Sequence, residues 1–255
     1  MRDKWSKAKA RSIDENKSIL LVLLIYVSQK ATRRFQQVLF VIDPNFDFMR
    51  WKTRSQEEAR LGYLVNQSAA SNDFLWDLID LSGITTILEL GSNSGNRLID
   101  VASRFPEKTF VGVDINISAV TLGNEWATTK GIENLTFIHA DITSPQFYTY
   151  FLNRKFDCVV TWATLIYIHP VRIKKLVQFL LAITSKQIVL IEQNDSRLGV
   201  FPKYLGIPVP GEPTWVRNYE KIFSSVKSHK TFDVNLEPVS EEIWHPGGDS
   251  LPLSM

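Results

Sequence analysis

Hydrophobic and polar positions change their spacing repeatedly along the chain, and these changes mark the expected elements. Between residues 84 and 192, short apolar runs alternate with segments whose apolar residues recur at helical spacing. The expected strands are 84–90, 108–114, 135–139, 156–162 and 187–192. Helices are expected between them over 97–104, 116–129, 145–152 and 170–183. Strands spaced by helices of this length predict an α/β fold with a mostly parallel, doubly wound sheet and right-handed crossovers.

The chain upstream of this core also carries helical patterns. Apolar spacing over residues 55–81 predicts one or two helices, which Gly83 ends. Residues 19–27 are uniformly apolar and follow a polar, basic segment, as in signal peptides and membrane anchors. The run is nine residues long, however, and a spanning helix needs about 20. Three interpretations stay open: a helix packed on the domain or on another subunit, peripheral membrane attachment, and secretion.

The alternation of expected strands and helices ends after residue 192. Residues 195–213 are rich in Gly and Pro and form a loop too long to be a simple connector. A helix is expected over 215–223, and weak strands over 226–234 and 242–244 could complete the sheet. The expected organisation is an N-terminal extension with the apolar helix (1–54), a single domain (55–245) and a flexible tail (246–255).

Composition narrows the class of protein without identifying a partner. The chain has 255 residues, 44% of them hydrophobic and 22% charged, as in globular proteins. A net charge of +2 does not indicate the strongly basic face that nucleic-acid-binding proteins usually show. The single cysteine, Cys158, excludes an intrachain disulfide and fits a reducing compartment. We therefore expect a cytoplasmic protein, with membrane association left open by residues 19–27.

The segment 87–96 reads as a strand that runs into a Gly-containing turn and then into a helix. Gly91 and Gly95 mark a turn where the backbone adopts unusual angles or closely approaches a ligand. Free N–H groups at a helix N-terminus, together with the absent Cβ atoms, let a nucleotide lie against such a turn. The same pattern also occurs in ordinary strand-to-helix connections of α/β proteins.

Acidic residues mark the ends of three successive expected strands, where doubly wound sheets bind ligands. Glu89 lies at the end of the first strand, Asp114 ends the second, and Asp141 follows the third. An acid about 20 residues after a Gly turn is placed to accept hydrogen bonds from ribose hydroxyls. Asp141 is placed to accept one from an adenine amino group. Asn93 and Asn96 replace glycines of the dinucleotide fingerprint, which argues against NAD and FAD.

These motifs, over about residues 84–192, resemble those of the class I S-adenosylmethionine-dependent methyltransferases. Residues 89–96 are similar to the family's first motif, with Asn93 in place of its middle glycine. Residues 111–115, 139–142 and 156–170 resemble its ribose-binding, adenine-binding and fourth motifs. The resemblance implies a seven-stranded sheet with an antiparallel last strand, and S-adenosylmethionine as cofactor. The cofactor-binding residues that it implies are Glu89, Gly91, Ser92, Asn93, Gly95, Asp114, Ile115, Asp141, Ile142 and Trp162.

The resemblance also implies methyl transfer by in-line displacement, in which the protein mainly positions the acceptor and excludes water. An acceptor atom that carries a proton needs a base. His169 is the first candidate, because its ordinary pKa is suitable and it follows the fourth strand. Its alternative role is to cap the helix that starts near Pro170. Glu192 and Asp195 are weaker candidates for the base.

The acceptor is expected to be a small molecule or a glycan. Nucleic-acid amino methyltransferases carry Asn/Asp-Pro-Pro-aromatic in the fourth motif, whereas residues 161–164 are Thr-Trp-Ala-Thr. A nucleic-acid acceptor is therefore unexpected. Residues 195–213 and the N-terminal helices are expected to cover the site. One alternative is a non-catalytic subunit or scaffold that binds the cofactor or docks a partner through its N-terminal segment. The other is a nicotinamide oxidoreductase, which Asn93 and Asn96 disfavour.

Overall fold

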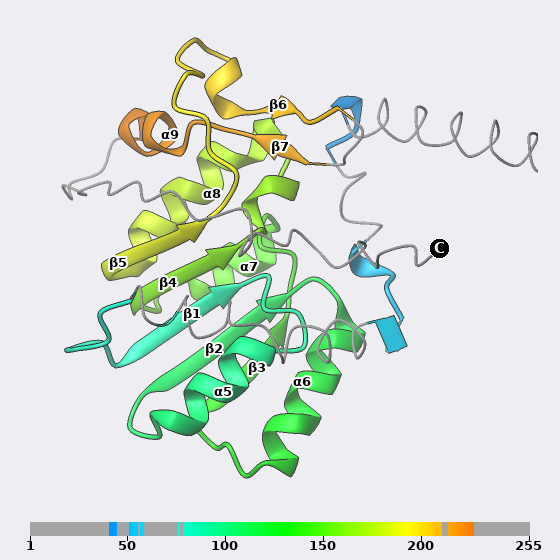
Figure 1. Ribbon diagram of the computed structural model, residues 1–255, viewed down its shortest axis with the longest axis vertical. Coiled ribbons are helices and arrows are strands. Elements are labelled where there is room, and N and C mark those ends of the chain that lie inside the picture. Colours follow the sequence, from blue (N-terminus) through cyan, green and yellow to red (C-terminus); the bar gives the residue numbers. More distant parts are fainter. Residues whose placement is uncertain are drawn as a thin grey trace, which may run out of the picture.

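The protein is built around one parallel sheet with helices on both faces (Figure 1). The computed structural model describes residues 41–44, 51–55, 57–58, 76, 79–210 and 214–226. The strands of the sheet are β1 (Thr86–Leu90), β2 (Thr109–Asp114), β3 (Leu135–His139), β4 (Phe156–Trp162) and β5 (Thr184–Ile191). They lie in the order β3-β2-β1-β4-β5, and every neighbouring pair is parallel. The predicted doubly wound α/β fold is therefore confirmed.

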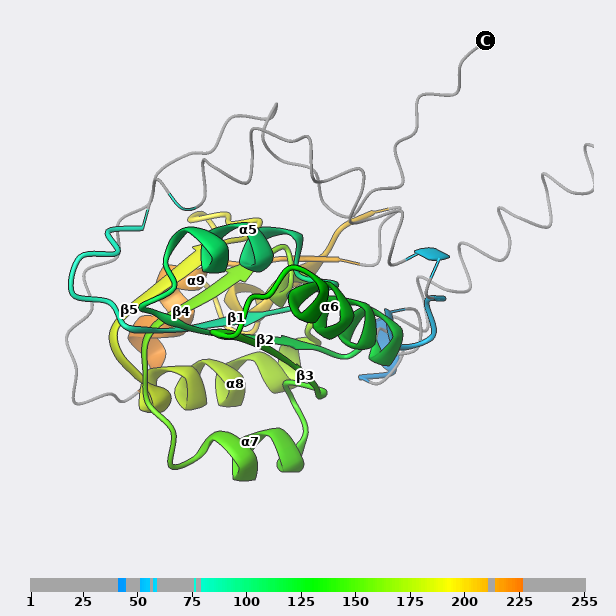
Figure 2. The ribbon, with the colours of Figure 1, turned by 90° about the horizontal axis from the view of Figure 1, so that it is seen from below.

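Two pairs of helices cover the sheet, one pair on each face (Figure 2). One face carries α5 (Asn96–Arg104) and α6 (Ile117–Thr129), and the other carries α7 (Pro145–Phe151) and α8 (Pro170–Ile183). Alternate residues of β1 point to opposite faces. Ile87 accordingly packs in the core under α5 and α6, whereas Leu88 packs in the core under α8. The two cores explain why the strands read as continuous apolar runs.

Side-chain caps fix where several helices begin. The Asn116 side chain accepts hydrogen bonds from the backbone N–H groups of Ser118 (2.9 Å) and Ala119 (3.2 Å) at the start of α6. Ser144 caps α7 in the same way. Such caps satisfy the free N–H groups of a first helical turn. Asn116 is therefore the residue at which α6 begins.

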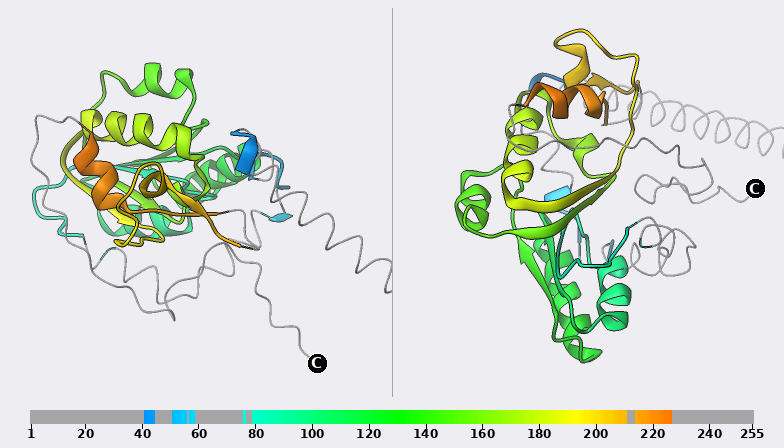
Figure 3. Two further views of the ribbon diagram at one scale, coloured as in Figure 1. Left: turned by 90° about the horizontal axis from the view of Figure 1, so that it is seen from above. Right: turned by 90° about the vertical axis from the view of Figure 1, so that its left-hand side faces the viewer.

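The segment after β5 differs in part from the expectation. It contains the 3₁₀ turn η2 (Lys203–Leu205), the antiparallel strands β6 (Ile207–Pro208) and β7 (Trp215–Val216), and helix α9 (Tyr219–Ser225). These elements lie beyond the β5 edge of the sheet (Figure 1 and Figure 3). The helix expected over 215–223 was placed too early. Residues 215–216 pair with β6, and the Asn218 side chain caps α9 by accepting from the Lys221 N–H (2.8 Å).

Several expectations fall on residues that the structure does not describe. They concern the apolar run 19–27, most of the helices over 55–81, the two late strands over 226–234 and 242–244, and the tail. The described sheet has five strands, and the residues expected to form two further ones, 227–234 and 242–244, lie outside the described part of the chain. Within the described helices, none is long and apolar enough to cross a membrane.

Candidate active site

The carboxyl ends of β1, β2 and β3 bring the Gly turn and the acidic residues to one edge of the sheet. Leu90 pairs with Val113, and Asp114 pairs with His139. The backbone N–H groups of Gly91 (2.7 Å) and Ser92 (3.1 Å) both donate to the Val113 carbonyl, which folds the turn over the end of β2. The Gly turn and the acidic residues at the strand ends, grouped from the sequence, therefore also lie together in space.

The turn itself depends on left-handed backbone conformations. Gly91, Asn93 and Gly95 have φ angles of 71°, 50° and 80°. Asn tolerates this region better than most residues with a Cβ, so Asn93 can replace a glycine here. Gly95 also makes room for a side chain, because a Cβ there would lie 1.9 Å from Cζ of Phe137. The departure from the motif at position 93 is thus compatible with the turn.

Asp114 connects this turn to the start of α6. Its Oδ2 accepts a hydrogen bond from the Asn93 N–H (2.8 Å), and its Oδ1 accepts one from the Asn116 N–H (2.8 Å). Burial raises the pKa of Asp114, and the neighbouring Glu89 adds to the rise, while the backbone donors oppose it. Each carboxylate oxygen has room for a second donor. A ribose with two adjacent hydroxyls matches this acceptor pair.

Glu89 forms a buried ion pair with Arg97, a residue that is not among the cofactor-binding residues expected from the sequence. Both Nε (2.9 Å) and Nη2 (2.8 Å) of Arg97 donate to Oε1 of Glu89. The Arg97 guanidinium also lies over the Trp162 ring, 4.9 Å from its centroid. Arg97 lies in the first turn of α5, on the helix that follows the Gly turn. Its place directly after the Gly turn is the feature of the sequence that could have identified Arg97 as a residue of the site.

Three buried polar atoms around the turn have no hydrogen-bond partner within the described part of the chain. They are Oε2 of Glu89, Oγ of Ser92 and Nδ2 of Asn96. Buried polar groups in native proteins are nearly always paired. A carboxylate, a hydroxyl and an amide at the same turn therefore indicate a polar ligand with both donors and acceptors. The amino-acid end of S-adenosylmethionine has this character, and Asp114 suits its ribose, so the residues fit that cofactor.

The adenine end of the expected site is less complete. Oδ1 of Asp141 accepts from the backbone N–H (2.7 Å) and from the hydroxyl (2.8 Å) of Thr143. Ile115 is half-buried beside Asp114, whereas Ile142 is buried in the core on the α7 and α8 face. Asp141 and Ile115 are therefore available at the edge of the sheet, and Ile142 supports them from within the core.

The loop after β4 packs directly on the Gly turn. The Thr164 hydroxyl lies 3.1 Å from the Leu90 carbonyl, and a Cβ on Gly91 would lie only 2.0 Å from Oγ1 of Thr164. Gly91 is therefore required by this contact as well as by its φ angle. Oε1 of Glu192 accepts from the Thr161 hydroxyl (2.8 Å) and from the Thr164 N–H (3.0 Å). Burial raises the pKa of Glu192. Its hydrogen bonds fix the loop after β4 to the end of β5.

His169 has the geometry of a helix cap. Its Nδ1 accepts from the Val171 N–H (3.3 Å), and its Nε2 lies 3.1 Å from the Val41 carbonyl. The ring is 8% exposed and meets the Trp215 ring edge-on at 5.3 Å. Both ring nitrogens thus have partners, and the contact of Nδ1 with the Val171 N–H is that of an N-cap of α8. The catalytic role remains a prediction.

Asp195, one of the two weaker candidates for a base, binds the exposed Arg197 side chain through both carboxylate oxygens, each at 2.8 Å. These bonds lower the pKa of Asp195 to about 2. A carboxylate with so low a pKa is a weak proton acceptor at neutral pH. Asp195 therefore stabilises the start of the loop after β5.

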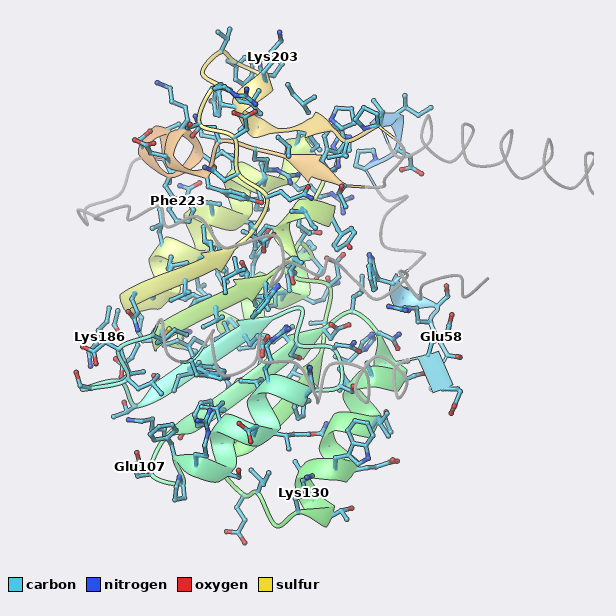
Figure 4. All side chains as sticks on the ribbon, in the orientation of Figure 1. Glu58, Glu107, Lys130, Lys186, Lys203 and Phe223 are labelled. Carbon is cyan, nitrogen blue, oxygen red and sulfur yellow. The ribbon has the colours of Figure 1, made fainter. Side chains whose placement is uncertain are left out.

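Parts of the N-terminal segment lie along the same edge of the sheet. The Trp51 ring meets the Tyr167 ring at 4.9 Å, and the Arg54 carbonyl accepts from Nδ2 of Asn116 (3.1 Å). Figure 4 labels Glu58 on this side of the molecule and Lys186 and Glu107 on the opposite side. Residues 51–54 therefore contact both the loop after β4 and the cap of α6.

Comparisons with known proteins point to a particular chemistry. Residues 87–186 match a family described as a methyltransferase domain. Relatives named tRNA (guanine-N(7)-)-methyltransferase include one from Porphyromonas gingivalis, 36% identical over 56 residues, which are 22% of this chain and 23% of that protein. Another, from Psychromonas ingrahamii, is 30% identical over 96 residues, 32% of this chain and 40% of that protein. The matches thus span well under half the length of these relatives.

Similar solved structures have lower identity. An O-methyltransferase from Brevibacillus brevis in complex with S-adenosyl-L-homocysteine is 16% identical, with a TM-score of 0.47, over 56% of this chain and 45% of that one. An S-adenosylmethionine-dependent methyltransferase from Clostridium acetobutylicum is 16% identical, with a TM-score of 0.42, over 53% of this chain and 56% of that one.

The relatives correct one expectation. Nucleic acid was held to be an unlikely partner, and that expectation is contradicted by relatives named for a tRNA. The net charge of +2 sums the whole chain and does not report where basic side chains gather. The absent Asn/Asp-Pro-Pro-aromatic motif bears on exocyclic amines, whereas a ring nitrogen makes no such demand. Residues 87–186 therefore carry a match to a methyltransferase domain, and the parallel sheet, the acids at its strand ends and the polar atoms of the Gly turn that lack a partner within the described residues fit S-adenosylmethionine as cofactor.

Proposed function

We propose that this protein methylates RNA, with N7 of a guanine as the acceptor atom. The observation that carries the proposal is the similarity to tRNA (guanine-N(7)-)-methyltransferases, which are 30–36% identical over 56–96 residues. The proposal replaces the small-molecule or glycan acceptor expected from the sequence. It concerns the acceptor, since the methyl donor follows from the domain itself.

The chemistry of guanine N7 agrees with the environment of His169. N7 is a ring nitrogen that carries a lone pair and no proton. No side chain therefore has to remove a proton before or during the transfer. An oxygen or amine acceptor would instead favour a base with a free ring nitrogen or carboxylate at the loop after β4. His169 and Glu192 both use their acceptor atoms on backbone N–H groups in this region, which supports an acceptor without a proton.

The residues of the site then act mainly by binding and orientation. When bound, S-adenosylmethionine supplies a methyl group activated by its sulfonium. Asp114 would hold the ribose, and Asp141 would bind the adenine amino group. Glu89, Ser92 and Asn96 would pair with the amino-acid end through the polar atoms that lack a protein partner within the described residues. Preorganised groups of this kind accelerate a displacement by fixing the two reactants in line.

The N-terminal segment would cover the site. Trp51 and Arg54 contact Tyr167 and Asn116, which come from opposite sides of the Gly turn in the sheet order. A cover at this position would exclude water from the methyl group. This interpretation agrees with the expectation that N-terminal residues close over the site.

The proposal is tested with the purified chain, radiolabelled S-adenosylmethionine and a tRNA transcript. We expect label in the RNA, and we expect strand cleavage at the modified guanine after borohydride reduction and aniline treatment, which detects N7-methylguanine. Asp114→Ala serves as the inactive control. Label in RNA without cleavage would move the acceptor to another atom and overturn the N7 assignment. No label in any RNA would overturn the proposal as a whole.

A further inference from the structure

A cleft of about 350 Å³ opens between the starts of α7 and α8, and Asp141 is the one residue of its lining that the proposed reaction uses. The residues that line it are Asp141, Thr143, Ser144, Pro145, Tyr148, Val171, Arg172 and Lys175. Asp141 also belongs to the cofactor site, so the cleft begins where the adenine end of that site is expected. Its lining residues Tyr148 and Arg172 belong to α7 and α8, two helices that cover the same face of the sheet (Figure 2).

Two basic side chains of α8 face this cleft together. Arg172 and Lys175 are three residues apart, so they lie on the same side of the helix. Nη1 of Arg172 donates to the Thr143 hydroxyl (3.2 Å), and Nζ of Lys175 lies 4.8 Å from the centroid of the Tyr148 ring. The guanidinium and the ammonium are thus both positioned by residues on the opposite wall.

The remaining polar groups of the cleft include a phenol donor and a single carboxylate. Tyr148 contributes a phenol whose pKa is raised to about 12 by burial and by Asp141, so it stays protonated and can donate. Asp141 is the one carboxylate in the lining, and its Oδ1 already accepts two hydrogen bonds from Thr143. A cleft with two cations and a phenol suits an anion with several oxygens.

We propose that this cleft binds a backbone phosphate of the RNA substrate, away from the methylated base. The inference rests on the proposed function. A planar guanidinium can bind two phosphate oxygens at once, and a lysine adds a point charge. Phosphate contacts of this kind set the register of a nucleic acid on a protein without reading its sequence. Because Asp141 borders both sites, a phosphate held here would orient the strand relative to the methyl donor.

The test compares two variants with the same charge change on neighbouring residues. Lys175→Glu alters the cleft, whereas Lys174→Glu alters an exposed residue of α8 that is not part of the cleft lining. RNA affinity is measured by fluorescence anisotropy with a labelled tRNA transcript, and S-adenosylhomocysteine affinity by calorimetry. We expect Lys175→Glu to weaken RNA binding at least tenfold and Lys174→Glu less than threefold. Both variants should bind S-adenosylhomocysteine as the unmodified protein does.

Two measurements distinguish an RNA backbone phosphate from the phosphate of a free nucleotide: the salt dependence of RNA binding, and competition by guanosine monophosphate. Removing both charges in Arg172→Gln/Lys175→Gln should lower the slope of log K against log salt by about 0.7 per lost contact on single-stranded RNA. Guanosine monophosphate should compete only weakly, and competition as strong as that of RNA would overturn an RNA backbone site.

Two further outcomes distinguish this inference from the proposed function. Equal weakening by Lys174→Glu and Lys175→Glu, in a protein that still methylates RNA, would overturn the cleft alone. Failure of the unmodified protein to bind or methylate RNA would overturn the proposed function and the cleft with it.

Discussion

Glu192 and Arg217 bind the same residue, Leu165, one through its N–H and the other through its carbonyl. Oε1 of Glu192 accepts from the Leu165 N–H (3.0 Å), and Nη1 of Arg217 donates to the Leu165 carbonyl (2.8 Å). Leu165 starts the 3₁₀ turn η1 (Leu165–Tyr167) directly after Thr164, which packs on Gly91. Arg217 is fully buried and also donates to the Leu205 and Ile168 carbonyls. The loop beside the cofactor turn is therefore fixed by two buried side chains, one just after β5 and one just after β7.

Glu192→Gln should change how stability depends on pH. Burial raises the pKa of Glu192 above the ordinary 4.5. An acid with a raised pKa in the folded state binds its proton more tightly folded than unfolded, so its stabilising contribution is complete below pH 4.5 and is lost as pH rises through the folded pKa. The difference in unfolding free energy should therefore shift in favour of the Gln variant as pH rises. Urea denaturation at several pH values measures it, and a difference independent of pH would contradict the assignment.

Arg217→Met should destabilise the fold strongly, because it leaves several buried carbonyl groups without a donor. Each unsatisfied buried polar group costs about 1–3 kcal/mol, so we expect a loss of at least about 2 kcal/mol in unfolding free energy. Arg197→Met is the matched control, since the Arg197 side chain is 88% exposed, and its effect should stay within about 0.5 kcal/mol. Similar losses in the two variants, measured by urea denaturation, would refute a structural role for the buried guanidinium.

Gly91→Ala should weaken cofactor binding through a clash with Thr164. Gly131→Ala is the control, because Gly131 has a similar φ of 68° against 71° at Gly91, but a Cβ added there would meet no atom within 4 Å. Both variants carry the left-handed strain of about 1–2 kcal/mol, and only Gly91→Ala adds the clash. Adding Thr164→Ala to Gly91→Ala should restore part of the lost stability and part of the lost S-adenosylhomocysteine affinity, and a double-mutant cycle measures this coupling. Equal effects at positions 91 and 131 would show that the contact is unimportant.

Asp114→Ala should lower S-adenosylhomocysteine affinity more than tenfold, since a hydrogen bond to a charged group contributes about 1.5–3 kcal/mol. The pKa of Asp114 is raised, so in the unmodified protein the affinity should fall as pH decreases toward that pKa, because protonation removes acceptor capacity. The Ala variant should lack this pH dependence. Calorimetry across a pH series gives both results.

Asp157→Asn is the control for Asp114, because Asp157 is the second residue of β4, at the far end from the site. Oδ2 of Asp157 accepts from the N–H (2.8 Å) and the hydroxyl (2.7 Å) of Thr85, and these bonds lower its pKa. This variant should lower stability and leave S-adenosylhomocysteine affinity unchanged. A change in affinity would indicate that the effect at position 114 is not local.

His169→Asn should separate capping from base catalysis. Asn is a good helix cap but cannot act as a base at neutral pH, so it keeps one role of His169 and removes the other. With guanine N7 as acceptor, we expect stability and turnover close to those of the unmodified protein. Methyl-transfer assays and thermal unfolding provide the two readouts. A loss of turnover with cofactor binding retained would instead establish His169 as the base.

The sequence by itself determined the alternation of strands and helices and the edge at which Glu89, Asp114 and Asp141 gather. It could do so because apolar periodicity is local, and because parallel strands with right-handed crossovers all end at one edge. The Asn116 cap is likewise a local feature, since its hydrogen bonds reach only two and three residues along the chain.

Only the tertiary structure decided which residues complete the site. The Arg97 pair with Glu89, the Thr164 contact with Gly91, and the hydrogen bonds of Glu192 and Arg217 to Leu165 join residues eight to 73 positions apart. Trp215 likewise starts strand β7 and not the expected helix, because it pairs with β6. No local pattern encodes such contacts, because they depend on how whole elements pack. The cleft between α7 and α8 exists only once both helices lie on the same face of the sheet.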